Sequence, residues 1–207
     1  NGLKGILSSR EIWCTEYRGL NDSSELRYSQ KFLEPEIKNL GLELSTQTIL
    51  RALKEVYLFS CCKHDNDYDK ENGLLSMWRG YGSSGGYALV FNKSPILANE
   101  EKYAHFEGAV EYPENSKEFH DNEENKKSLN HACKFIKRFV LEKSSPSRDE
   151  LNAIIKLLMF RKHHAFFEER EYRIAIMDMG DGVLKPSIRD KGNYLCAYIS
   201  IFIKNFE

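Results

Sequence analysis

Hydrophobic residues recur along the chain with two different periods, and these periods predict both helices and strands. In helical segments an apolar residue returns every three or four positions and so lines one face of the helix. This spacing predicts helices over residues 2–7, 46–54, 131–141 and 148–160, and a short helix or turn over residues 74–79. A further helix is expected to begin after Asp22 or Ser23 and to end near residue 33, because either side chain can accept from the amides of a first helical turn.

Shorter apolar runs, rich in β-branched and aromatic residues, predict the strands. Residues 56–62 are apolar almost throughout and of strand length, so we expect a buried central strand there. Further strands are predicted over residues 11–15, 87–91, 106–112, 171–177 and 194–203. Residues 63–72 are expected to form an exposed loop, and residues 116–130 a charged surface stretch. Because the elements show no regular βαβ alternation and no internal repeat, the sequence predicts an α+β domain with mixed or antiparallel sheets and flanking helices.

Composition indicates a folded and nearly neutral protein. The 207 residues suffice for one domain over residues 1–207, and 41% of them are hydrophobic. The formal charge of −1 removes the overall attraction to phosphate that strongly basic nucleic-acid-binding proteins have. No apolar run reaches the roughly 20 residues that span a bilayer, and the first residues do not form a signal peptide, so we expect a cytoplasmic protein without a membrane partner. Because the sequence opens within a helix, we also expect that a first strand precedes it.

The cysteines and histidines give little support for metal or disulfide chemistry. The five cysteines include no CxxC pair, so reduced thiols are expected. The neighbouring His163 and His164 lack a third ligand at a fitting spacing, and no metal site is predicted. A nucleophilic pair of Cys61 with His163 stays open, although Cys61 lies in the expected buried strand.

The segment over residues 167–174 carries the first candidate chemistry. On a strand, Glu169, Glu171 and Arg173 would share one face. One carboxylate can then orient a sugar hydroxyl while its neighbour stabilises developing positive charge or acts as a base. The alternative is a solvent-facing strand edge with a cross-strand ion pair, and the spacing by itself leaves both interpretations open.

A glycine-rich segment over residues 77–86 is the second candidate. Its Trp78 and Tyr81 can stack on a base or on nicotinamide, and Arg79 can bind a phosphate. The segment matches neither a Walker loop nor a GxGxxG motif after a strand. A β-turn with a packed tryptophan is the structural alternative.

Asn21 and Asp22 form the third candidate, within the polar residues 20–25. They can form a polar ligand-binding lip between a strand and a helix. The alternative is that they only cap the helix.

Taken together, these segments resemble a large bacterial domain family of unknown function that is often found near phage-defence genes. The match follows the order of the family along nearly the whole chain. It involves residues 2–7, 12–15, 20–25, 58–61, 77–86 and 167–173. The family opens with a strand that bears a His-Tyr-Thr-like motif, and this strand would precede residue 1.

The layout is also similar to that of divergent ADP-ribosyltransferases, including the type that modifies DNA. This resemblance implies that Glu171 is the catalytic glutamate, that Glu169 orients the acceptor and that Arg173 holds the strand or a phosphate. It also implies that NAD is bound by the remaining motifs. Their candidate residues are Trp13, Thr15, Asn21, Asp22, Trp78, Arg79, Tyr81 and Arg173. The Ser-Thr-Ser element of such enzymes is not visible in this sequence.

The expected function is therefore that of an NAD-dependent ADP-ribosyltransferase-like toxin or anti-phage defence effector. Its acceptor would be a nucleic acid or a protein, and an antitoxin or another defence protein would be its partner. NAD glycohydrolase activity, with water in place of the acceptor, is the enzymatic alternative. A non-catalytic module that senses a nucleotide or binds a partner is the alternative from another class. A nuclease is less favoured, because two nearby acids without a third acid or a lysine motif make a poor metal site.

Overall fold

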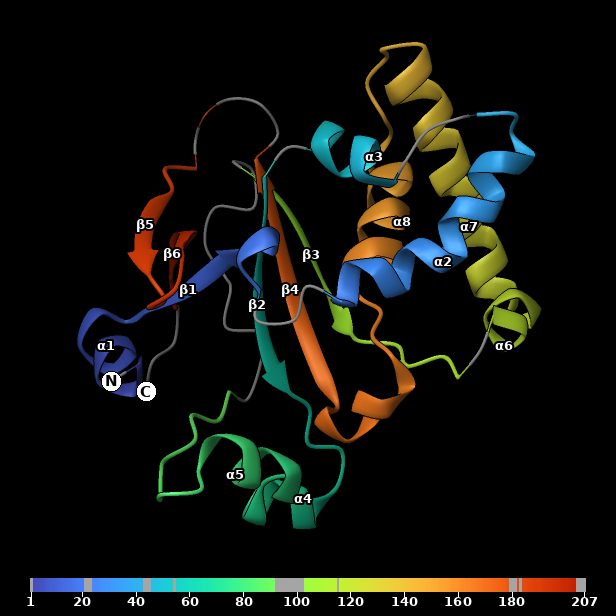
Figure 1. Cartoon of the computed structure of the whole chain (residues 1–207). Coiled ribbons are helices and arrows are strands. Elements are labelled where there is room, and N and C mark those ends of the chain that lie inside the picture. The colour runs from blue at the N-terminus through green and yellow to red at the C-terminus, as the bar shows by residue number, and fades with distance from the viewer. Residues whose placement is uncertain are drawn as a thin grey trace. The chain divides into compact units, whose positions relative to one another are not determined.

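The computed structural model describes residues 2–20, 24–42, 46–53, 55–91, 103–114, 116–178, 182 and 184–203. The chain forms two compact units. The first comprises Asn1–Leu20, Val56–Glu107 and Glu168–Glu207, and the second Asn21–Glu55 and Gly108–Phe167. The first unit holds the sheet and the second most of the helices (Figure 1). The expectation of a single domain stays a prediction.

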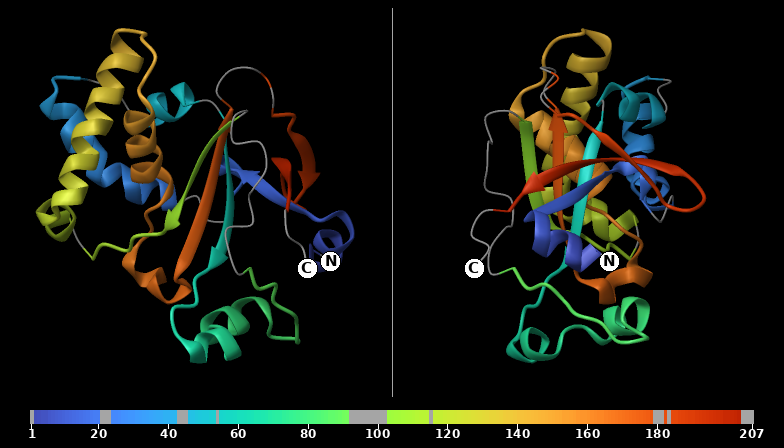
Figure 2. Two further views of the ribbon diagram at one scale, coloured as in Figure 1. Left: turned by 180° about the vertical axis from the view of Figure 1, so that it is seen from behind. Right: turned by 90° about the vertical axis from the view of Figure 1, so that its left-hand side faces the viewer.

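A six-stranded sheet forms the first unit. Its strand order is β3-β4-β2-β1-β6-β5. The bounds are β1 Glu11–Glu16, β2 Val56–Cys62, β3 Tyr103–Ala109, β4 Glu171–Asp178, β5 Ser187–Asp190 and β6 Leu195–Phe202. The registers of β1 with β2 and β6, of β2 with β4 and of β5 with β6 are antiparallel, and β3 runs opposite to β4 beside it (Figure 2). The α+β class with an antiparallel sheet is thus confirmed, as is the central place of β2.

One face of this sheet forms the hydrophobic core of the first unit. The core consists of Ile12, Cys14, Tyr57, Tyr103, Ile174, Ile176, Ile199, Ile201 and Ile203. Ile6 of helix α1 (Gly2–Ser9) packs against this cluster. Each large side chain that is buried in the core contributes about 2 kcal/mol to the free energy of folding. Because side chains alternate along a strand, Trp13, Thr15, Glu171 and Arg173 lie on the opposite face. These four predicted site residues therefore lie on the other side of the sheet from this core.

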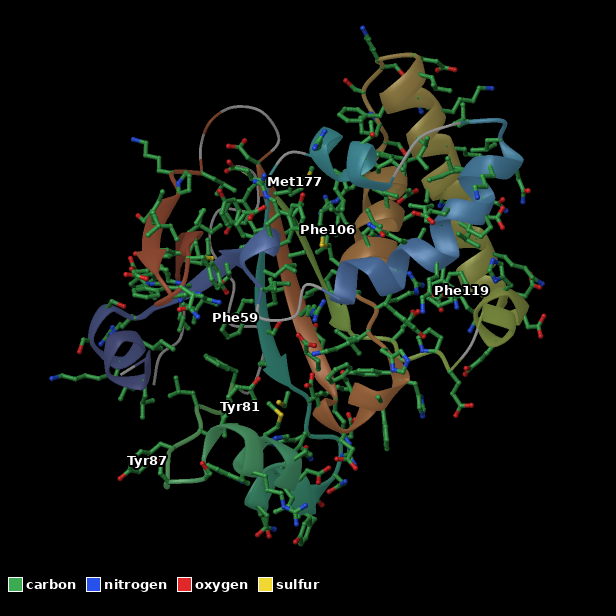
Figure 3. The ribbon with its side chains drawn as sticks, viewed as in Figure 1. Phe59, Tyr81, Tyr87, Phe106, Phe119 and Met177 are labelled. Atoms are coloured by element: carbon green, nitrogen blue, oxygen red, sulfur yellow. The ribbon has the colours of Figure 1, made fainter. Side chains whose placement is uncertain are left out.

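Two segments of the first unit differ from the expectation. Residues 63–72 are not only a loop, because they contain α4 (Asp67–Asn72), whose amide at Asp69 donates to Oδ1 of Asn66 at 2.8 Å. Residues 87–91 form no strand, and Tyr87 is 87% exposed and points away from the strands (Figure 3). An apolar run becomes a strand only where a neighbour supplies hydrogen bonds and packing, and β3 and β5 occupy the two edges of the sheet.

The remaining boundaries of this unit agree more closely with the sequence. α1, β1, β2, β4 and β6 lie within two residues of their predicted ranges. The predicted strand over residues 106–112 is shifted, because β3 begins at Tyr103 and ends at Ala109. β5 was not predicted, since its four residues are mostly exposed and show no apolar alternation.

The second unit is helical. It contains α2 Ser24–Asn39, α3 Thr46–Ala52, α6 Ser116–Asp121, α7 Glu123–Phe135, the π-helical turn η2 Ile136–Leu141 and α8 Arg148–Met159. Phe119 lies among these helices (Figure 3). Its ring centroid is 4.4 Å from that of Phe32. α2 continues beyond the predicted end near residue 33, although it contains Pro35. A proline inside a helix costs roughly 3 kcal/mol, and burial of Ile37 offsets part of this cost. Residues 116–130 likewise form helices, with Phe119 fully buried. None of the helices in the described ranges is long and apolar enough to cross a membrane.

Helix α8 begins with a capping box, and this motif yields a first prediction. The amide of Glu150 donates to Oγ of Ser147 at 3.2 Å, and the amide of Ser147 donates to Oε2 of Glu150 at 2.8 Å. Because Ser147→Ala removes one of these bonds, we expect the free energy of unfolding to fall by about 1 kcal/mol in urea denaturation at neutral pH. Ser145→Ala, in the exposed loop before the cap, should leave it unchanged. Equal stabilities of the two variants would contradict the capping role.

The second hydrogen bond of the capping box, from the Ser147 amide to the Glu150 carboxylate, depends on pH. The amide of Ser147 and the Arg138 guanidinium hold the pKa of Glu150 below its usual 4.5. A carboxyl whose pKa is lower in the folded state stabilises the fold above its unfolded pKa, and this contribution is lost as the pH falls through the folded value. The contribution of Glu150 should accordingly be complete at neutral pH and decline as the pH falls below 4.5 toward the lower folded-state pKa.

Candidate functional site

The chain changes direction at the residue before β4. The 3-10 helix η3 (His164–Glu169) ends at Glu169, and Arg170 has a φ of 43°, which is uncommon for any residue other than glycine. β4 starts only at Glu171. The prediction that Glu169, Glu171 and Arg173 share one strand face is therefore wrong for Glu169, because a strand alternation cannot continue through a left-handed residue into a 3-10 helix.

Glu171 and Arg173 form a buried ion pair on β4. Nε of Arg173 donates to Oε1 of Glu171 at 2.7 Å and Nη2 donates to Oε2 at 2.9 Å. The two side chains are 9% and 3% exposed. The interpretation as a solvent-facing strand edge is thus wrong, because β4 lies between β3 and β2. A two-pronged arrangement of this kind fixes the position of the carboxylate.

Contacts with the α4 region hold Arg170 in its left-handed conformation. Its guanidinium forms an ion pair with the largely buried Asp69, which also accepts from Nδ2 of Asn66 at 2.7 Å. The backbone oxygen of Arg170 accepts from the amide of Lys63 at 2.8 Å. Both the side chain and the backbone of Arg170 are therefore anchored where β4 begins. Asp69 was not among the predicted residues, because it lies in a polar stretch expected to be a loop.

Helix α5 (Leu75–Tyr81) carries the second candidate motif next to this anchor. Oγ of Ser76 donates to the backbone oxygen of Glu168 at 3.2 Å. The indole of Trp78 donates to the backbone oxygen of Asn72 at 2.7 Å. A Cβ added to Gly73 would lie 2.6 Å from Nε1 of Trp78, and one added to Gly82 would lie 2.8 Å from its ring. The glycines thus make room for the tryptophan itself, which supports the structural alternative for Trp78.

The two other candidates of this motif are open to solvent. Arg79 is exposed, and Tyr81 is 78% exposed at the end of α5. They keep the accessibility that a ligand-binding residue needs, and their role in binding stays a prediction.

Trp13 and Thr15 belong to a cluster at the other end of the sheet face. The other members of this cluster are Tyr198 on β6 and Arg189 on β5. The Trp13 and Tyr198 rings lie 4.5 Å apart, and Nη2 of Arg189 donates to Oγ1 of Thr15 at 2.6 Å. The structure thus brings these two predicted residues together with two that the sequence analysis missed. Asn21 and Asp22 lie outside the described residues.

The core face carries a row of groups at the ends of β2, β3 and β4. Burial and the nearby Glu171 and Glu107 raise the pKa of the Cys61 thiol to about 11. Burial, Glu107 and Cys61 also raise the pKa of Tyr172. Cys61 is therefore protonated at neutral pH, and the thiol lacks the thiolate form that a nucleophile needs. This argues against the pair of Cys61 with His163.

The described cysteines form no disulfide. Within the same part of the chain, no group of three or more His, Cys, Asp or Glu side chains is arranged to hold a metal ion.

Comparison with known families matches one segment that contains two of the candidate motifs. Residues 77–174 match a family described as "Protein of unknown function (DUF2971)". The matched segment covers slightly less than half of the chain, begins just before Trp78 and ends one residue after Arg173. The matched segment thus includes both the α5 motif and the head of β4. No curated protein matches the chain. No solved structure matches it either.

Proposed function

We propose that the chain is an NAD-dependent ADP-ribosyltransferase-like toxin or anti-phage defence effector, which modifies a nucleic acid or a protein in the bacterial cytosol. The observation that carries the proposal is the buried carboxylate of Glu171 at the head of β4, held by Arg173 and preceded by the left-handed Arg170. Unusual backbone conformations that their surroundings hold in place are concentrated at functional sites. The family match supplies no activity, so the reaction rests on this arrangement and on the resemblance of the Glu169–Glu171 spacing.

A fixed carboxylate suits the chemistry of this transfer. The bond between the ribose carbon and nicotinamide breaks, nicotinamide leaves with the bonding electrons, and the ribose carbon gains positive charge before the acceptor attacks it and loses a proton. The Glu171 carboxylate would accept a hydrogen bond from a ribose hydroxyl and stabilise this positive charge. The two hydrogen bonds from Arg173 hold the Glu171 carboxylate in one position. Glu169, at the end of η3, would orient the acceptor.

Labelled NAD provides the test. When the full chain is incubated with labelled NAD and bacterial extract, we expect label on a macromolecule, and Glu171→Gln should lower this labelling by about 100-fold or more, as for the loss of a group that stabilises transition-state charge. Glu168→Gln, which alters an exposed carboxylate close by, should label normally. The double variant Glu171→Gln with Arg173→Gln avoids an uncompensated buried charge, and its thermal unfolding shows whether it is folded.

The outcomes separate the proposal from its alternatives. Labelling that persists in a folded variant without the Glu171 carboxylate would overturn the role of Glu171. Free ADP-ribose without any labelled macromolecule would instead identify an NAD glycohydrolase, in which water is the acceptor.

A non-catalytic nucleotide-sensing or partner-binding module is the second candidate. The observation that favours it is the low exposure of the Glu171 side chain, because a catalytic carboxylate must contact its substrate. This candidate predicts that NAD binds without labelled product and without free ADP-ribose, and that substitution of both Glu169 and Glu171 leaves the biological effect intact.

A further inference from the structure

Arg189 on β5 has an unusual environment for a cation at the sheet edge. Among the residues that the structure describes, its hydrogen bonding is limited to the donation from Nη2 to Oγ1 of Thr15. Its Nε is shielded from solvent and has no hydrogen-bond partner in that part of the chain. No described carboxylate forms an ion pair with it. Shielding a charged donor without a partner costs free energy, so the position requires an explanation.

Two aromatic rings from other strands hold the guanidinium in place. The Arg189 guanidinium carbon lies 5.5 Å from the ring centroid of Trp13 on β1 and 5.7 Å from that of Tyr198 on β6. Both distances are within the range of cation–π attraction. Thr15 is buried and fixes one end of the group. The guanidinium is therefore oriented by three side chains and neutralised by none of them.

Arg18 in the same unit shows what a structural arginine looks like in this protein. It also lies over an aromatic ring, 5.5 Å from the centroid of Tyr17. In contrast to Arg189, its Nε forms an ion pair with Oε1 of Glu16 at 2.7 Å. Both arginines thus contact an aromatic ring, but only Arg18 is described as paired with a carboxylate. Among the described residues Arg189 has no such carboxylate, and packing does not explain this.

We infer that Arg189 binds the phosphate of a nucleotide whose base stacks on Trp13. The planar guanidinium matches phosphate oxygens, and Trp13 is 47% exposed and so retains ring surface for a base. Stacking of a base on such a ring stabilises the bound nucleotide. Arg189 and Trp13 lie on the sheet face that also carries Glu171. The site concerns binding alone, so it stands or fails independently of the proposed transfer reaction.

Calorimetric titration with ADP tests the phosphate contact. The full chain should bind ADP, and Arg189→Gln should weaken this binding by at least about tenfold, the effect of losing one charge-assisted hydrogen bond. Arg18→Gln is the matched control and should bind ADP within about twofold of the unchanged chain. Arg189→Lys retains the charge but not the planar fork, so its affinity should lie between those of the unchanged chain and Arg189→Gln. Failure of the unchanged chain to bind ADP, or equal affinities of the two Gln variants, would overturn the inference.

Tryptophan emission tests the position of the base. The chain has two tryptophans, and ADP should quench emission of the unchanged chain but not that of Trp13→Phe, in which Trp78 remains. Inorganic pyrophosphate carries the phosphates without a base and should bind more weakly than ADP. Undiminished quenching in Trp13→Phe, or pyrophosphate affinity equal to that of ADP, would rule out the stacked nucleotide.

Discussion

Glu171→Gln is expected to lower the free energy of unfolding by about 3–5 kcal/mol, because it removes the carboxylate that pairs with the buried Arg173 guanidinium. Both side chains are less than one tenth exposed, and two hydrogen bonds join them. Urea denaturation followed by circular dichroism measures the loss. Glu168→Gln is a control on an exposed residue three positions away and should change the stability by less than about 0.5 kcal/mol.

A double-mutant cycle separates the ion pair from other contacts of these two residues. Arg173→Met alone should cost a similar amount, because it leaves the Glu171 carboxylate buried beside an apolar group. The variant with both substitutions should lose much less than the sum of the two single losses, since neither charge then remains. Additive losses would show that the two side chains act separately, and the ion pair would then not explain the fixed position of Glu171.

Gly19→Ala is expected to destabilise the first unit by about 3 kcal/mol, at the upper end of the usual cost of overpacking. A Cβ at this position would lie 2.1 Å from Sγ of Cys196 and 3.3 Å from its Cβ. Cys196 is buried, so it has little room to move away. The Gly19 oxygen also accepts from Nζ of Lys191 at 3.0 Å and from the Tyr194 hydroxyl at 3.3 Å, which restrains the backbone.

Thermal unfolding of three variants checks this packing argument. Cys196→Ala combined with Gly19→Ala removes the sulfur atom and should recover much of the lost stability. Gly5→Ala is the matched control, because an added Cβ there would meet nothing within 4 Å and alanine favours the α1 helix by up to about 1 kcal/mol. If Gly5→Ala and Gly19→Ala are equally stable, close packing against Cys196 is not what excludes a side chain at Gly19.

Local patterns in the sequence were sufficient for most elements. β2 and β4 were predicted almost to the residue, and the amphipathic spacing located α8. These signals are local, because burial of one helix face or one strand depends on the spacing of its own residues. The α+β class followed from the order of such elements. Glu171 and Arg173 were also singled out from their spacing alone.

Errors arose where the outcome depended on neighbours that the sequence does not identify. The apolar residues 87–91 look like a strand, but the sheet provides them with no partner. Glu169 has strand-like spacing from Glu171, but the left-handed Arg170 separates them. That conformation is held by Asp69, which lies 101 positions away in the chain. A local sequence pattern cannot predict a contact between residues this far apart in the chain.

The sequence by itself thus determined the α+β class and most strands and helices, because each follows from short-range periodicity. Only the tertiary structure decided that Glu171 and Arg173 form a buried ion pair, since β3 and β2 enclose β4. It also decided that Thr15 meets Arg189, 174 positions away, because β6 pairs with both β1 and β5. Strand order sets which distant side chains become neighbours, and it follows from the packing of the whole sheet.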